Sequence, residues 1–139
     1  MRAYAATTRT LSAQLKAEHG LSITDYEALY QLSHAEGRRM KRVDLARRLL
    51  LTPSGVTRLL EGLEEAGLVE RSVSSTDHRV IYAELTEAGA AKLEAASCSH
   101  LLSIRALLET HFSDEELELL AELLRKIPGV EDDSPCATA

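Results

Sequence analysis

Apolar residues recur along most of this chain with the period of an α-helix, and they change to an alternating pattern in one central segment. The clearest helical stripe follows the i, i+3, i+4, i+7 spacing of one buried face and consists of Val56, Leu59, Leu60 and Leu63. Thr52 and Pro53 precede it as a capping hydroxyl and a proline suited to the first helical position, and Gly67 follows it as a left-handed cap. The pattern therefore predicts a helix over residues 53–66.

The same periodicity predicts three helices before this one. The first covers residues 4–18, and the third is a compact helix over residues 43–50. The second begins at Thr24, because Glu27 stands three residues later, as a capping box requires. Its predicted inward-facing side chains are Tyr26, Leu29, Tyr30 and Leu32. Met40, in the basic link before the third helix, is expected to add a brief strand.

A hairpin is predicted next, because alternating residues form two strands, over residues 68–73 and 80–85, around a polar turn. Two closely linked helices followed by such a hairpin are the outline of a winged helix-turn-helix. We therefore expect a mainly α-helical fold with a small β-wing. In this prediction residues 23–89 form the winged helix-turn-helix of a single domain over residues 1–139.

Two amphipathic helices are predicted after the hairpin, one capped by Thr86 and the other opened by the capping box Ser113–Glu116. Their leucine stripes are larger than one small winged domain can bury. We therefore expect residues 1–20 and 90–127 to form a helical dimerisation region from both chain ends, and thus a homodimer. Residues 130–139 are small and acidic, and they are expected to be disordered.

The charge of the chain is unevenly distributed. The formal net charge is −6, but the segment from Arg38 to Arg79 holds nine Lys/Arg and six Asp/Glu, so it is +3 and the rest is −9. Salt screens charges farther apart than about 10 Å, so the local charge decides how this segment interacts with a phosphate backbone. The distribution is compatible with DNA binding, although composition alone equally fits an ordinary solvated surface.

Small polar residues and an arginine lie on the outer face of the predicted helix over residues 53–66. Small side chains allow close approach to bases and phosphates, and the helix N-terminus favours phosphate. Arg58 can bind guanine or phosphate in the major groove. The residues expected to contact DNA from this helix and its surroundings are Arg42, Thr52, Ser54, Gly55, Thr57, Arg58 and Arg71. An ordinary surface helix is the alternative interpretation of this segment.

The predicted hairpin tip carries Asp77, His78 and Arg79, which complete the expected DNA contacts. An arginine in this place suits the narrow minor groove, where the electrostatic potential is most negative. Asp77 is expected to orient the guanidinium of Arg79 by a bidentate pair. The alternative is a surface salt bridge worth less than about 1 kcal/mol.

These segments also carry a family resemblance. In their order and spacing, residues 45–58, 63–71, 77–79 and 85–89 resemble the MarR family of bacterial transcriptional regulators. The resemblance implies a homodimer in which each subunit places the Pro53 helix in a major groove and the Asp77/Arg79 wing in the neighbouring minor groove. Many members are repressors released by small phenolic ligands, oxidants or metals. Gly62 departs from the pattern, since many members carry arginine there.

The sensing chemistry is weakly specified by the sequence. Tyr26 and Tyr30 are candidates to line a pocket for a small aromatic effector, with core packing as the alternative. Cys98 is expected to be a small core residue, and with Cys136 in the tail it forms no disulfide framework. His100 and His111 share a helix face but lie about 16 Å apart along its axis, so one helix cannot join them through a metal. A metal site that uses a second chain or a second helix stays open.

Other function classes have little support. The sequence has no Gly-rich phosphate loop, metal-ligand cluster or nucleophile–base pair, so we expect neither an enzyme nor a bound cofactor or metal. It has no membrane span and no signal peptide, which indicates a cytoplasmic protein. We expect a ligand-responsive repressor that binds a pseudo-palindromic operator as a homodimer. The alternative is a winged-helix protein-docking or dimerisation module without sequence-specific DNA binding.

Overall fold

The computed structural model describes residues 2–74 and 77–127 of the 139-residue chain. The chain divides into two compact units, residues 1–96 and residues 97–139. None of the described helices is both long enough and apolar enough to cross a lipid bilayer. The predicted disordered tail, residues 130–139, lies outside the described residues, as does Cys136.

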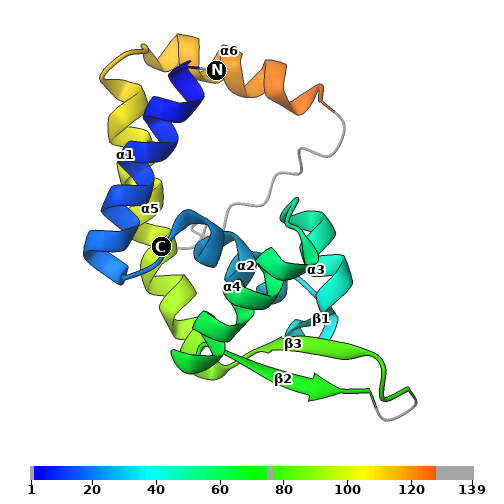
Figure 1. Ribbon diagram of the computed structural model, residues 1–139. Helices are drawn as coiled ribbons and strands as arrows, with labels where there is room; N and C mark the ends of the chain where they lie inside the picture. Colours follow the sequence, from blue (N-terminus) through cyan, green and yellow to red (C-terminus); the bar gives the residue numbers. More distant parts are fainter. Residues whose placement is uncertain (1, 75–76, 128–139) are drawn as a thin grey trace. The chain divides into compact units, whose positions relative to one another are not determined.

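The first unit contains a winged helix-turn-helix, and it is built on four helices, the start of a fifth and a small sheet (Figure 1). Its elements are α1 (Arg2–His19), α2 (Ile23–Ser33), a short 3₁₀ turn (Glu36–Arg38), β1 (Arg39–Lys41), α3 (Arg42–Arg48), α4 (Pro53–Glu65), β2 (Val69–Val73) and β3 (Ile81–Leu85). Helix α5 (Glu87–Glu109) begins in this unit and continues into the second, which also holds α6 (Asp114–Arg125). The predicted fold class, mainly helical with a small β-wing, is confirmed.

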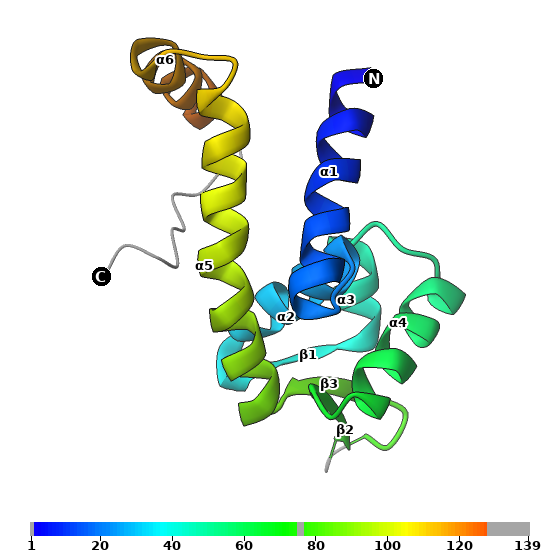
Figure 2. The same ribbon diagram turned by 90° about the vertical axis from the view of Figure 1, so that its left-hand side faces the viewer.

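The three strands form an antiparallel sheet in the order β1-β3-β2. Ala83, in the middle of β3, pairs with Met40 on one side and with Arg71 on the other. Met40 and Ala83 are both buried, so this face of the sheet packs on the helices. The brief strand expected at Met40 is thus confirmed. The sheet lies on one side of α2, α3 and α4 (Figure 2), and the β2–β3 hairpin extends beyond these helices as the wing (Figure 1).

The core of the first unit is aliphatic. Its fully buried leucines come from four helices and are Leu15, Leu29, Leu32, Leu45 and Leu60. The predicted stripe of α4 is confirmed, with Val56, Leu60 and Leu63 buried and Leu59 partly buried. Each such side chain contributes about 1.5–3 kcal/mol by leaving water, which fixes the face that α4 turns inward. Its opposite face is therefore left to solvent.

The start of α2 corrects one prediction. Its N-cap is Ser22, whose Oγ accepts from the Asp25 N–H (3.1 Å), while Asp25 Oδ2 accepts from the Ser22 N–H (2.7 Å). The prediction of Thr24 with Glu27 was therefore wrong by two residues. Both pairs fit the capping-box spacing, and the burial of Leu21 just before Ser22 selects the earlier start, as in a hydrophobic staple.

The second unit contains far less buried surface. The capping box of Ser113 and Glu116 is confirmed at the start of α6, but no residue of this helix is buried. Its exposed large apolar residues are Leu119, Leu120, Leu123 and Leu124, and Ile127 follows the helix. On α5, His100 is buried, and the loss of solvation lowers its pKa.

Cys98 corrects another prediction, because it is exposed and not part of the core. The buried positions on this part of α5 are Leu93, Ala96, Ser97 and His100, which follow a spacing of three and four residues. Residue 98 is rotated by roughly 100° from residue 97 on a helix of 3.6 residues per turn. The small size of cysteine therefore misled the expectation, and the helical phase decides its exposure.

Candidate nucleic-acid interface

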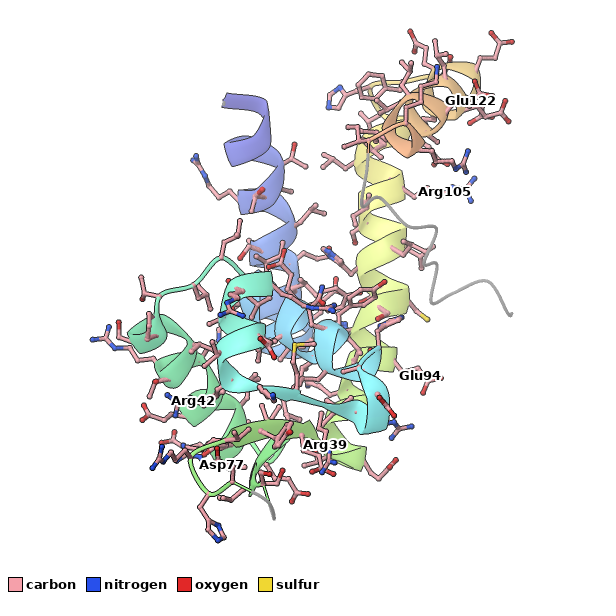
Figure 3. All side chains as sticks on the ribbon, turned by 90° about the vertical axis from the view of Figure 1, so that its right-hand side faces the viewer. Arg39, Arg42, Asp77, Glu94, Arg105 and Glu122 are labelled. Carbon is pink, nitrogen blue, oxygen red and sulfur yellow. The ribbon has the colours of Figure 1, made fainter. Side chains whose placement is uncertain are left out.

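A hydrogen-bond chain fixes α3 against α4. Arg42 at the start of α3 donates from Nη2 to Thr57 Oγ1 (3.0 Å), and the Thr57 hydroxyl donates to the Pro53 carbonyl (2.8 Å). Both side chains are partly buried, and Figure 3 labels Arg42 at this junction. Because the Thr57 hydroxyl already has two partners, it positions the helix pair more readily than it contacts a ligand.

The N-terminus of α4 is capped and closely packed. Thr52 Oγ1 accepts from the Gly55 N–H (3.1 Å) and lies 3.2 Å from Ser54 Oγ. A Cβ added to Gly55 would lie 3.1 Å from the same Thr52 oxygen, so a larger residue would press on the cap. Ser54 is exposed beside it. Pro53 has no N–H and the Gly55 N–H is capped by Thr52, so this end of the helix offers the Ser54 N–H and small hydroxyl side chains to an anion, which the helix dipole favours.

Arg58 lies on the exposed face of α4 one turn further along. Within residues 2–74 and 77–127, its guanidinium has no hydrogen-bond or ion-pair partner. Other arginines of the basic segment are engaged internally, since Arg38 pairs with Glu87 (2.8 Å) and Arg47 with Asp44 (3.2 Å). The five donors of Arg58 are thus directed at solvent.

The wing tip is shaped by Asp77, but not as the sequence predicted. Asp77 Oδ1 accepts from the backbone N–H of Arg79 (3.0 Å), and Val80 donates its N–H to the Asp77 carbonyl (2.9 Å). In the described part of the chain no ion pair joins the Asp77 carboxylate to the Arg79 guanidinium, so the expected bidentate pair is wrong. The short Asp77 side chain bonds the backbone N–H two residues ahead more easily than it pairs with the guanidinium at the end of the long, solvated Arg79 side chain.

The consequence is an exposed turn over residues 77–79 whose backbone is hydrogen-bonded and whose guanidinium is available for an outside partner. Asp77, His78 and Arg79 are all exposed, and Figure 3 labels Asp77 on the wing. The Arg79 side chain has no partner among the residues that the structure describes. Arg79 on the wing thus resembles Arg58 on α4, because each presents a cation without a counter-ion among the described residues.

Arg71 has a different environment from Arg58 and Arg79. Its Nε and Nη2 each lie 3.4 Å from a carboxylate oxygen of Glu64, so it bridges β2 to α4. The sequence singled out the charge of Arg71 without this partner, because Glu64 is seven residues away on another element. The bridge therefore helps to hold β2 of the wing in position against α4.

Tyr26 and Tyr30, the candidate effector residues, stack on one another on α2 with ring centroids 6.4 Å apart. Both are partly buried and pack against the core, and Tyr30 also contacts the His34 ring at 4.3 Å between centroids. Within the described ranges, no three His, Cys, Asp or Glu side chains are close enough to hold a metal ion. The structure thus places the two tyrosines together and gives each a packing role.

Comparison with known proteins extends this description. Residues 19–80 match the family model described as MarR family. The transcriptional repressor YetL of Bacillus subtilis is 36% identical over 108 residues, which are 78% of this chain and 64% of YetL, so the match spans less than two thirds of that protein.

Two solved structures from Streptomyces coelicolor are similar over most of the chain. AbsC, a MarR family transcriptional regulator, has 31% identity and a TM-score of 0.73, with coverage of 89% of this chain and 86% of AbsC. Sco3205, a MarR family transcriptional regulator solved in complex with DNA, has 26% identity and a TM-score of 0.75, with coverage of 89% and 80%.

Proposed function

The chain belongs to the MarR family of transcriptional regulators, and we propose that it binds a pseudo-palindromic DNA operator as a homodimer and represses transcription. The observation that carries the proposal is the pair of exposed guanidiniums, on Arg58 and Arg79, without internal partners in the described part of the chain. They lie on the two elements that a winged helix-turn-helix turns toward a duplex. The repressor YetL and the DNA complex of Sco3205 support the same function.

In the major groove, the N-terminal half of α4 supplies the contacts. Thr52 Oγ1 already accepts from the Gly55 N–H, and Pro53 has no N–H, so the Ser54 N–H and hydroxyl are offered to a phosphate, whose charge the helix dipole favours. Arg58, one turn further, reaches a guanine edge or a neighbouring phosphate. Arg42 and Thr57 hold α3 and α4 at a fixed angle, so that these contacts occur together.

In the minor groove, the wing supplies Arg79 with His78 beside it. The Asp77 carboxylate holds the backbone of the tip through the Arg79 N–H, which leaves the guanidinium free to enter the groove. Narrow A·T-rich minor grooves attract such a side chain through their strong negative potential. Arg71 takes part indirectly, because its bridge to Glu64 sets where the wing lies relative to α4.

The homodimer uses residues 1–20 and 90–127 in this proposal. The exposed leucines of α6 support it. An amphipathic helix is normally stabilised by burying its apolar face, and in α6 no residue is buried within one chain, so a second chain would supply the missing contacts. Twofold symmetry would place the two α4 helices about 34–36 Å apart, one turn of DNA. Sedimentation at micromolar protein should then show twice the chain mass of 15.2 kDa, and a clean monomer would contradict this part.

Ligand response forms the last part of the proposal. A small aromatic effector would bind beside Tyr26 and Tyr30, whose stacked rings lie on the helix that packs against α4. Binding there would favour a position of α4 that does not match the duplex. DNA affinity should then fall as an aromatic ligand is added, with Tyr30→Leu reducing the response.

The test of DNA binding is selection of duplexes from a random pool by the purified protein, followed by titration at several salt concentrations. We expect an inverted repeat and an affinity that falls linearly with salt on a logarithmic scale, since each neutralised phosphate releases counterions. An affinity independent of salt would contradict the phosphate contacts. Failure to bind any duplex would instead favour a winged-helix docking module.

A further inference from the structure

Exposed polar side chains follow the outer face of α4, opposite its buried stripe. Ser54, Arg58 and Glu61 stand at positions i, i+4 and i+7, which share one face of a helix with 3.6 residues per turn. A homeodomain contacts bases in the major groove from positions i, i+3, i+4 and i+7 of its recognition helix. If α4 enters a major groove as proposed above, Glu61 therefore faces the base edges beside Arg58.

Glu61 is exposed, and its charge is not neutralised within the protein. Among the residues that the structure describes, its carboxylate accepts no hydrogen bond and forms no ion pair. The side chains that can reach it along the helix are three and four residues away, and they are Thr57, Arg58, Glu64 and Glu65. Arg58 is the one cation of this set, and in the described structure it forms no ion pair with Glu61.

Another glutamate of the same helix shows what a structural carboxylate does here. Glu64 is partly buried, and its two oxygens each lie 3.4 Å from a guanidinium nitrogen of Arg71 on β2. Its removal would leave Arg71 without this partner. Glu61 makes no such contact within the described residues, so its carboxylate is available to an outside donor.

A carboxylate in the major groove is selective because most groups there repel it. Guanine presents the acceptors N7 and O6, and thymine presents the acceptor O4. Adenine has an N6 donor, but its N7 acceptor lies beside that donor. Cytosine presents the N4 donor without an acceptor on its own major-groove edge. A carboxylate that loses water without gaining a donor is destabilised, so cytosine is the base that suits it.

We propose that Glu61 is a specificity-determining residue of the DNA site and accepts a hydrogen bond from N4 of one cytosine in each half-site. Glu61 lies about 4.5 Å beyond Arg58 along the helix axis, which is close to the rise of about 3.4 Å per base pair. The cytosine should therefore lie within about two base pairs of the Arg58 contact. This inference rests on the proposed function, because it requires α4 to enter a major groove.

The experiment compares wild type with Glu61→Gln, which has the same size and no charge. Duplexes are selected from a random pool, and affinities are then measured on four duplexes that differ only at the selected base pair. Wild type should prefer cytosine about tenfold over the other three bases. Glu61→Gln should prefer adenine instead, because the glutamine amide bonds both N6 and N7 of that base.

Two further variants separate a base contact from other effects of the charge. Glu65→Gln removes the same charge from an exposed position one turn farther along α4, and it should leave the preferred bases unchanged. Combining Glu61→Gln with Arg58→Ala tests whether Glu61 acts only by orienting Arg58. Measured at low salt, the change from cytosine to adenine should persist without the arginine. Its disappearance would overturn the direct contact.

The outcomes also separate this inference from the proposed function. If Glu61→Gln binds every duplex more tightly by the same factor and selects the same bases as wild type, Glu61 only repels phosphates and the inference is overturned alone. The same holds if Glu61→Gln and wild type do not differ at all. Failure of the wild type to bind any duplex would overturn the proposed function, and the inference with it.

Discussion

The two halves of α4 share one buried stripe but differ in the space that they leave on their other faces. In the N-terminal half, a Cβ on Gly55 would lie 3.1 Å from Thr52 Oγ1, so the glycine fits a crowded cap. In the C-terminal half, a Cβ on Gly62 would meet nothing within 4 Å. We assign the crowded end to DNA, whereas the open end lines a cavity between helices.

The difference shows that two glycines in one helix can have different structural roles. Gly55 leaves room for the Thr52 hydroxyl that caps its own N–H, whereas Gly62 borders a cavity between helices. Both lie in the same regular helix, so neither is needed for an unusual backbone conformation. Substitutions that treat the two glycines alike should therefore give different results.

The largest effect is expected where the link between α4 and β2 packs on the start of α5. A Cβ at Gly89 would lie 2.0 Å from the Leu68 carbonyl oxygen and 2.8 Å from Leu85 Cδ1. Gly89→Ala should destabilise the protein by about 3 kcal/mol or more, because backbone has to move. Urea unfolding at a fixed protein concentration measures this. A loss below about 1 kcal/mol would show that the junction is softer than the structure indicates.

The next effect separates unpaired from paired arginines. Arg58→Ala should weaken binding to the selected duplex by about 1–3 kcal/mol if the guanidinium contacts a base. Arg71→Ala should cost less, because Arg71 already pairs with Glu64 and acts on the wing position. Titrations of both variants at one salt concentration provide the comparison. Equal losses would remove the distinction between the two arginines.

The two glycines of α4 give a matched pair with a smaller effect. Gly62→Ala should stabilise the protein by up to about 1 kcal/mol, the difference in helix propensity in an open position. Gly55→Ala should lose this gain, because the new methyl group presses on a cap worth about 1 kcal/mol. Denaturant midpoints of the two variants measure the difference. Equal stabilisation would mean that the cap relaxes freely.

The smallest effect on stability is expected in the turn between α3 and α4, at Leu50. Leu50 has φ +53° and is 92% exposed, so it has a left-handed backbone without compensating burial. Leu50→Gly should stabilise the protein by about 0.5 kcal/mol, since the relief of strain exceeds the added flexibility of the unfolded chain. Leu50→Asn, which tolerates this conformation, is the matched control. Destabilisation by both variants would show that the Leu50 side chain has a contact of its own.

Much of the fold could be predicted from the sequence, because periodicity and caps are local signals. The stripe of α4, the Thr52 cap and the Ser113 capping box all depend on residues within one or two turns. The start of α2 was misplaced because two overlapping capping boxes fit, and only the burial of Leu21 separates them. Cys98 was misjudged because residue size was weighed above helical phase.

The sequence identified residues of the candidate site, but it did not identify the contacts that these residues make within the protein. The sequence named Arg42, Arg71 and Asp77, and it gave no sign that they engage Thr57, Glu64 and the Arg79 backbone. The first two contacts join different elements, and the third is a local competition between two acceptable partners. The cavity beside Gly62 could not be predicted either, since it depends on where α1, α4 and α5 meet.

The central claim is that the wing tip and the crowded end of α4 bind one duplex together. The most direct test is the affinity of Arg79→Ala for the duplex selected by the wild type, with Arg38→Ala as a control that removes the same charge from an arginine paired internally with Glu87. Our account predicts about tenfold weaker binding for Arg79→Ala, together with a relaxed preference for A·T pairs in the flanks. Wild-type affinity and preference in Arg79→Ala would contradict it.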